Sequence, residues 1–90
     1  MKENYSYPLD YNWSKEEIVI VMELWQALEK VYESTMEVED FKHSYQKFKK
    51  VVPSIGEEKK LGKEFEEIAG YSLYRVVQKA KSLTSGRLKM

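Results

Sequence analysis

Cysteine is absent from this chain of 90 residues. Its absence excludes disulfide bonds, thiolate chemistry and cysteine-ligated zinc sites. Long apolar runs are missing as well, because the longest extends only from Ile18 to Met22, far below the ~20 residues that span a bilayer. No apolar run follows a basic N-terminus, as it would in a typical signal peptide. We therefore expect a cytoplasmic protein that does not cross or enter a membrane.

Proline and glycine are scarce, with two and four copies, and this scarcity favours uninterrupted helices. Apolar residues make up 42% of the chain and charged residues 33%, which is typical of a globular rather than a disordered chain. A chain of this length forms one domain. We predict a single all-α domain over residues 1–90, a compact bundle of four main helices at residues 15–34, 38–52, 55–69 and 73–84.

Serine residues mark three of the four predicted helix starts. Ser14 is followed three residues later by Glu17, which is the pattern of a capping box, and Ser54 begins a second copy of it. Ser72 provides the third cap. The second helix has no such signal. Its separation from the first helix depends on a lapse in the apolar pattern at residues 34–36, and fusion of the two helices is the alternative.

The glycines of the third predicted helix differ in what they indicate. Gly70 suits the left-handed position that follows a helix end. Gly62 lies inside the helix, where glycine costs up to ~1 kcal/mol relative to alanine. Close packing of a neighbouring helix would explain Gly62, whereas Gly56 in the same helix has no such explanation.

The first predicted helix has a wider apolar face than the others, covering about half of its circumference. We expect it to lie centrally in the bundle, covered on two sides. Residues 1–13, rich in tyrosine, are predicted to form an arm that packs across the bundle. A surface for a protein or nucleic-acid partner is the alternative role for these tyrosines. Residues 85–90 are expected to form a frayed basic tail.

Few residues are suited to catalysis or metal binding. His43 is the single histidine and follows Asp40 by three residues. A carboxylate–histidine metal site in a helical bundle needs this Asp-x-x-His type of motif on two different helices. No Gly-x-Ser-x-Gly sequence occurs, and the glycines lack the spacing of a phosphate-binding loop. The acids of the third helix alternate with lysines, as on a solvated surface. We therefore expect a non-enzymatic protein without catalytic residues, metal ions, cofactors or a small-molecule substrate.

Charged residues are sorted along the chain, although 15 acids and 15 bases cancel in total. Residues 1–40 contain ten acids and three bases, a net charge of −7, and residues 41–90 contain five acids and twelve bases, a net charge of +7. This polarity favours electrostatic binding to a protein, including a second copy of the chain. Part of it can also be internal, with Glu16, Glu23 or Glu33 facing lysines of neighbouring helices.

The candidate partner-binding residues lie on the second and fourth predicted helices and combine basic groups with one aromatic ring: Lys49, Lys50, Tyr74, Arg75 and Lys79. We interpret them as part of the surface of a small protein-interaction module. The alternative is RNA or DNA binding, because basic groups beside aromatic rings contact phosphates and stack on bases. A sequence pI of about 6.6 disfavours this alternative, since nucleic-acid-binding domains usually have a pI above ~9.

Both ends of the chain resemble a known family. The strings Tyr-Pro-Leu-Asp-Tyr-Asn-Trp-Ser at residues 7–14 and Gly-Tyr-Ser-Leu-Tyr-Arg-Val-Val at residues 70–77 resemble those of uncharacterised protein family 0223, small proteins of Gram-positive bacteria. Pro53-Ser54, Glu57-Glu58-Lys59 and Phe65 extend the resemblance to essentially the whole chain. The resemblance implies a compact helical fold in the cytoplasm. It implies no activity, because the family has no established catalytic or binding residues to carry over.

Overall fold

Four helices and two very short strands make up the described part of the chain. The computed structural model describes residues 7–90. Its elements in order are α1 (Lys15–Glu33), β1 (Met36–Glu37), α2 (Val38–Val51), α3 (Ile55–Ala69), α4 (Leu73–Lys81) and β2 (Arg87–Leu88). The predicted all-α bundle is confirmed. The predicted separation of the first two helices is confirmed as well, because β1 lies between them.

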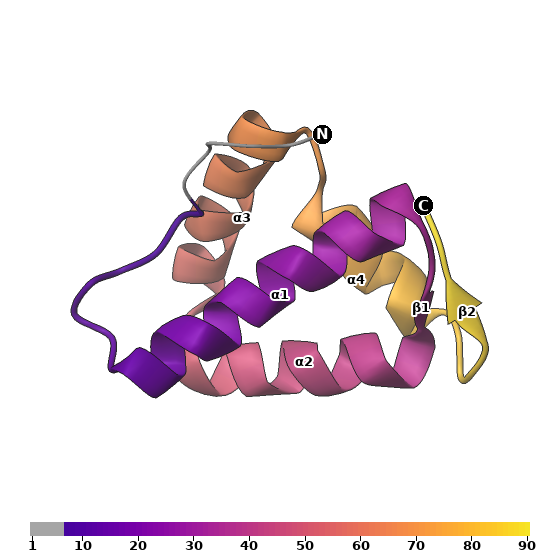
Figure 1. Ribbon diagram of the computed structural model, residues 1–90, viewed down its shortest axis with the longest axis horizontal. Helices are drawn as coiled ribbons and strands as arrows, with labels where there is room; N and C mark the ends of the chain where they lie inside the picture. The colour runs from indigo at the N-terminus through magenta and orange to yellow at the C-terminus, as the bar shows by residue number, and fades with distance from the viewer. Residues whose placement is uncertain (1–6) are drawn as a thin grey trace.

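The helices pack as two contacting pairs. α1 runs along α2, and α3 packs against α4, which also contacts α1 and α2 (Figure 1). The segment before α1 passes from the side of α3 to the start of α1. None of the helices within residues 7–90 is long and apolar enough to cross a membrane.

The predicted caps are present at the starts of α1, α3 and α4. The Glu17 backbone N–H donates to Ser14 Oγ at 3.1 Å, and the Ser14 N–H donates to Glu17 Oε1 at 2.8 Å, which completes a capping box. Ser54 and Ser72 each accept a hydrogen bond from the N–H three residues later, at 3.3 and 3.2 Å. At Ser54 this is only one half of the predicted capping box, because the Glu57 side chain does not accept from the Ser54 N–H. Gly70, with a φ of 81°, ends α3 in the left-handed conformation that was predicted.

The core is centred on α1, and Trp25 joins the elements around it. Its ring stacks on Phe65 of α3 with 4.7 Å between centroids, and meets Phe48 of α2 edge-on at 5.9 Å. Its Nε1–H donates to the Pro8 carbonyl at 3.1 Å, which ties the N-terminal arm to the core. The central position of the first helix is therefore confirmed. The packed arm is confirmed for Tyr7, Leu9 and Trp13, which lie against the core, but not for Tyr11, which is 85% exposed. The earlier part of the predicted arm, including Tyr5, lies outside the described residues.

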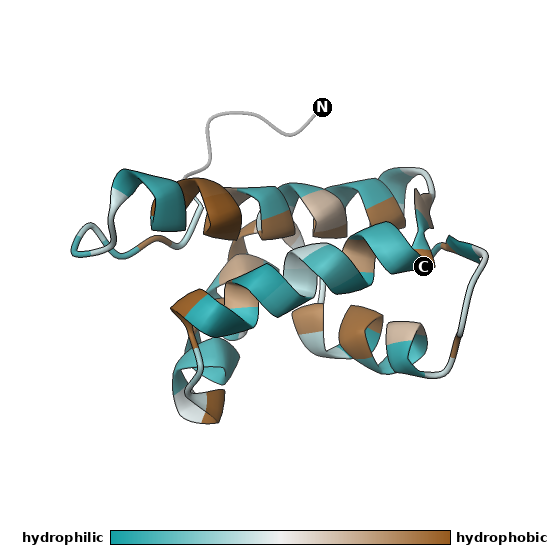
Figure 2. Ribbon diagram, turned by 90° about the horizontal axis from the view of Figure 1, so that it is seen from below, coloured by the Kyte–Doolittle hydropathy of each residue, from teal (hydrophilic) through white to brown (hydrophobic). Residues whose placement is uncertain are grey.

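The wide apolar face of α1 was predicted to be covered on two sides, but part of it is not fully covered. Leu24 and Val31 are fully buried, but Ile18, Ile20 and Met22 are only partly buried. Figure 2 shows hydrophobic residues alternating with hydrophilic ones along each helix, so that every helix has one side suited to the core.

The prediction of a frayed tail over residues 85–90 is wrong. β2 pairs antiparallel with β1, which places Leu88 opposite Met36, and Leu88 is fully buried. The turn that makes this pairing possible contains Gly86 at a φ of 99°, in the left-handed region that favours glycine. α4 correspondingly ends at Lys81, earlier than the predicted residue 84, because the chain has to turn back toward β1.

Candidate functional site

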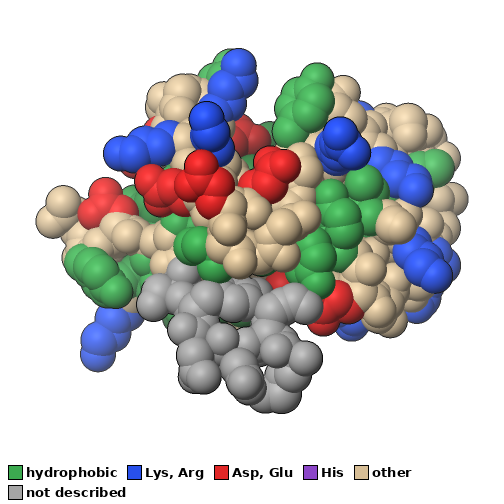
Figure 3. All heavy atoms as spheres, turned by 90° about the horizontal axis from the view of Figure 1, so that it is seen from above, with side chains coloured by type: hydrophobic (Ala, Val, Ile, Leu, Met, Phe, Trp, Pro, Cys, Tyr) green, Lys and Arg blue, Asp and Glu red, His purple; other side chains and the backbone are tan. Residues whose placement is uncertain are grey.

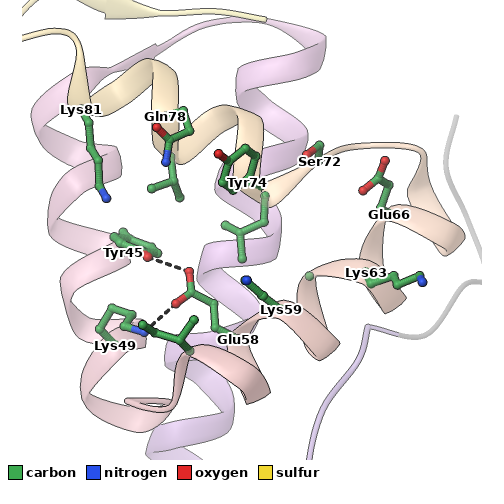
Figure 4. Close-up of a pocket in the computed structure, with 14 residues that line it drawn as sticks. Tyr45, Lys49, Glu58, Lys59, Lys63, Glu66, Ser72, Tyr74, Gln78 and Lys81 are labelled. Carbon is green, nitrogen blue, oxygen red and sulfur yellow. Dashed lines mark hydrogen bonds and ion pairs between the residues drawn. The ribbon is translucent and has the colours of Figure 1, made fainter.

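A cleft of about 670 Å³ lies where α2, α3 and α4 meet (Figure 4). The cleft is lined by side chains of all three helices and by the N-cap residue of α4. One wall is α3, the opposite wall is α4, and α2 closes one end. We refer to this feature as the α2–α3–α4 cleft.

The cleft exists because α3 and α4 each present a second face beside the one that enters the core. The core face of α3 carries Leu61 and Phe65, and its cleft face lies about 100° around the helix. Residues spaced by three or four share a helix face, and the cleft face follows this rule: Ile55, Lys59, Gly62 and Glu66 on α3, with Tyr74, Val77, Gln78 and Lys81 on α4.

Gly62 sets how closely the two walls approach. A Cβ atom at this position would lie 3.3 Å from Leu73 Cδ2 and 3.4 Å from Leu73 Cβ, which is tighter than an ordinary contact. The packing explanation predicted for Gly62 is therefore confirmed. At Gly56 the nearest atom to a Cβ would be Ser54 Oγ at 3.8 Å, so nothing in the packing requires glycine there.

The floor of the cleft is apolar, and each of its two walls carries one exposed apolar side chain. Leu73 and Val77 form the floor and are almost fully buried. Ile55 on α3 is 67% exposed and Tyr74 on α4 is 69% exposed. Two large apolar side chains thus face solvent on opposite walls of one concave surface.

A hydrogen-bonded group of polar side chains closes the α2 end of the cleft. The Tyr45 hydroxyl donates to Glu58 Oε2 at 2.6 Å, and Lys49 Nζ donates to Glu58 Oε1 at 2.5 Å (Figure 4). Burial raises the pKa of Tyr45 well above its usual range, and the hydrogen bond and negative charge of Glu58 raise it further. Tyr45 therefore stays a protonated hydrogen-bond donor near neutral pH, and the group links α2 to α3.

Three other lysines line the cleft. Lys59 and Lys63 belong to α3 and Lys81 to α4. Figure 4 shows Lys81 extending from its helix toward Tyr45. Within residues 7–90 these three ammonium groups make no ion pair, in contrast to Lys49. They give the rim of the cleft its positive charge.

The structure brings together only two of the five predicted partner-binding residues. Lys49 and Tyr74 line the cleft, whereas Lys50, Arg75 and Lys79 do not. Lys50 and Arg75 are both exposed. Each lies about 100° around its helix from the preceding residue, Lys49 or Tyr74, which lines the cleft. Lys79 Nζ donates to the Lys89 backbone carbonyl at 2.6 Å, so it is turned toward the C-terminal strand. The five residues therefore do not form one continuous surface.

Several cleft residues were not singled out by the sequence analysis. Helical spacing places Tyr45 on the apolar face of its helix. The alternation of acids and lysines places Glu58 and Lys59 on a solvated surface. The spacing of Tyr74, Gln78 and Lys81 along one helix face could have indicated a shared surface. No sequence signal indicates that this face opposes the second face of α3.

Acidic and basic groups are mixed on the surface around α3. The face shown in Figure 3 carries acidic side chains directly beside lysine and arginine side chains. A phosphate backbone is attracted by a continuous basic patch and repelled by carboxylates within it. The face shown in Figure 3 therefore does not present a continuous basic patch.

A second, shallower hollow of about 330 Å³ lies between α1 and α2 and contains His43. Asp40 and Glu23 also line it. Nevertheless, no group of three histidine, aspartate or glutamate side chains within residues 7–90 is placed to hold a metal ion. His43 itself is solvent-exposed on α2.

The chain is similar over its full length to several bacterial proteins. A family model described as "Uncharacterised protein family (UPF0223)" matches residues 4–89. The UPF0223 protein of Enterococcus faecalis is 53% identical over 98% of this chain and 96% of its own length. UPF0223 proteins of Bacillus mycoides and Streptococcus sanguinis are 50% and 48% identical, over 93% and 100% of this chain and 94% and 98% of their own lengths. These matches and the helical fold agree with the resemblance carried by residues 7–14 and 70–77, and the chain belongs to the uncharacterised protein family UPF0223.

Proposed function

We propose that this protein is a small, non-enzymatic interaction module that acts in the cytoplasm and binds a protein partner in the α2–α3–α4 cleft. The observation that carries the proposal is the exposure of Ile55 and Tyr74 on opposite walls of an apolar, concave surface. Exposed apolar patches with polar rims commonly mark protein contacts. Tyrosine is enriched among the residues that dominate binding free energy at such contacts.

The polar group at the end of the cleft supports binding rather than catalysis. Both carboxylate oxygens of Glu58 are engaged, one by the Tyr45 hydroxyl and the other by the Lys49 ammonium. Because burial and Glu58 raise the pKa of Tyr45, its hydroxyl gives up its proton less readily than that of an exposed tyrosine. A general base has to be free to take a proton from a substrate. Glu58 and Tyr45 are bonded to each other in the folded protein, so neither is free to take a proton from a substrate.

Site-specific photocrosslinking in living cells tests this proposal. A photoreactive benzoylphenylalanine replaces Tyr74 in the cleft in one strain and Lys50, which lies outside it, in a matched control strain. We expect a discrete protein adduct from position 74 and none from position 50. The adduct from position 74 should be lost when Ile55→Ser removes the exposed side chain on the opposite wall.

Equal adducts from positions 50 and 74, or an adduct from position 74 that survives Ile55→Ser, would contradict docking in the cleft. Circular dichroism of each variant shows whether the fold is intact. Sedimentation of the purified protein at low and high salt identifies the case in which the partner is a second copy of the chain.

RNA or DNA binding through the helix 2 and helix 4 surface is less well supported. Lys49 is paired with Glu58, and Lys79 is bonded to the Lys89 carbonyl. A gel shift with mixed RNA and DNA oligonucleotides at low salt measures this alternative directly. Binding that weakens on Arg75→Gln and Lys79→Gln substitution, with a steep salt dependence, would favour it over protein docking.

A further inference from the structure

The α2–α3–α4 cleft combines an apolar floor with an excess of available positive charge. Glu58 is already neutralised by Lys49. Besides Glu58, Glu66 is the single acidic residue in the lining, whereas Lys59, Lys63 and Lys81 are basic and have no ion pair within residues 7–90. The lining therefore carries three such lysines against one carboxylate; Figure 4 shows that Lys59 and Lys81 extend toward the cleft and that Lys63 extends away from it.

The spacing of the lysines indicates how a partner could match them. Lys59 and Lys63 are four residues apart, which separates them by about 6 Å along α3. Like charges at this spacing destabilise a helix, so carboxylates from a partner would relieve their repulsion. Two acids spaced by four residues on a partner helix have the same separation. Lys81 on the opposite wall would meet acids on the other flank of that helix.

The backbone of the walls favours a helix over an extended segment. A bound strand needs main-chain hydrogen-bonding partners, as at an open sheet edge. The walls of this cleft are the helices α3 and α4, whose backbone groups are bonded within each helix. A helical partner satisfies its own backbone and requires only an apolar groove.

We infer that the segment bound in the cleft is an acidic amphipathic helix, an inference that rests on the docking function proposed above. Its apolar face lies on Leu73 and Val77, between the exposed side chains of Ile55 and Tyr74. Its carboxylates face the lysines of the two walls, Lys59 on α3 and Lys81 on α4, with Lys63 at the outer edge. Because the rim charges are exposed, they contribute mainly to orientation, association rate and salt dependence.

Three synthetic peptides of about five helical turns test the inference on the full-length protein. The first has leucines at helical spacing with glutamates on both flanks, the second replaces every glutamate with lysine, and the third is a scrambled version of the first. Fluorescence anisotropy measures affinity, and amide chemical shifts map the site. We expect the acidic amphipathic peptide to bind at least tenfold more tightly than either of the others, with shifts at Gly62, Leu73 and Val77.

Charge reversal in the protein separates the inference from the proposed docking function. Lys59→Glu with Lys63→Glu should weaken binding of the acidic peptide at least tenfold and strengthen binding of the basic peptide. Lys50→Glu, outside the cleft, is the matched control and should change neither affinity appreciably. Raising the salt concentration from about 50 to 500 mM should weaken binding of the acidic peptide several-fold.

Tighter binding of the basic peptide in the cleft would overturn the acidic partner and leave cleft docking intact. Equal binding of the scrambled acidic peptide would overturn the amphipathic helix, because it would show attraction by charge alone. Failure of all three peptides would overturn the inference as well. In that case the position 74 and position 50 crosslinks still decide separately whether a protein docks in the cleft.

Discussion

Single residues decide how closely the elements approach one another, and the two glycines inside α3 illustrate this. Gly62 is buried against Leu73 of α4, so it is needed for packing. Gly56 lies in the exposed first turn of the same helix. Its Cβ position is open apart from an ordinary contact with Ser54. The same residue type therefore carries a packing constraint at one position and none at the other.

We predict different effects when alanine replaces these glycines. Gly56→Ala should raise the free energy of unfolding by up to about 1 kcal/mol, because alanine has the higher helix propensity. Gly62→Ala should gain less or lose stability, because the new methyl group crowds Leu73. Urea unfolding followed by circular dichroism measures both. Equal stabilisation by the two variants would contradict the packing constraint at Gly62.

Pairs of elements are joined by a few specific contacts. Tyr45 and Lys49 of α2 both bind Glu58 of α3 across a short turn. The C-terminal strand is joined to the rest by backbone pairing and by the burial of Leu88. Each of these contacts involves residues that the sequence pattern alone does not pair.

Stability at alkaline pH should depend on Tyr45. Its pKa is raised in the folded protein by burial and by Glu58, whereas in the unfolded chain it is about 10. Above about pH 10 the unfolded state releases this proton first, so the stabilisation present at lower pH is lost as the pH rises toward the folded-state pKa. We expect the urea midpoint to fall between about pH 9 and 11.5, and less steeply in Tyr45→Phe.

Tyr11→Phe is the matched control for this titration, because the Tyr11 side chain is 85% exposed. It should keep the alkaline decline of the wild-type protein. The same slope in Tyr45→Phe and wild-type protein would show that the Tyr45–Glu58 contact does not contribute.

The C-terminal strand should contribute substantially to stability, contrary to a frayed tail. Leu88→Ala removes a fully buried side chain and should lower the free energy of unfolding by about 2–5 kcal/mol. Lys89→Ala changes an exposed neighbour and should stay within about 0.5 kcal/mol of wild type. Thermal and urea unfolding compare the two. An unchanged free energy of unfolding in Leu88→Ala would show that the packing of β2 does not stabilise the core.

At the scale of the whole molecule, the charge polarity is distributed between internal pairs and open surface. Arg87 Nη1 lies 3.0 Å from Glu37 Oε2 and joins the basic to the acidic part of the chain. Lys49 and Glu58 form a pair within the basic part. The cleft lysines remain available for a partner. The polarity is therefore partly structural and partly a property of the proposed docking surface.

Trp25 joins α1 to three other parts of the molecule. It contacts Phe65 of α3, Phe48 of α2 and the carbonyl of Pro8 in the arm. Trp25→Phe loses the hydrogen bond and part of the ring, and should lower the free energy of unfolding by about 1–3 kcal/mol. Trp13→Phe, at a partly buried position, should cost less. Urea unfolding followed by circular dichroism checks this order.

Much of the architecture is predictable from local signals in the sequence. Ser14, Ser54 and Ser72 mark helix starts because a serine hydroxyl satisfies a free backbone N–H at the first turn. Gly70 marks a helix end because it adopts a positive φ without strain. The buried stripes of the helices follow from helical periodicity.

The sequence by itself determined the helices, their caps and the family, because each depends on local hydrogen bonding, side-chain periodicity or whole-chain similarity. Only the tertiary structure decided the pairing of β2 with β1, the Tyr45–Glu58–Lys49 group and the α2–α3–α4 cleft. These features join residues that are distant along the chain. Their geometry depends on how the helices cross one another, and side-chain periodicity along any one helix does not specify that crossing.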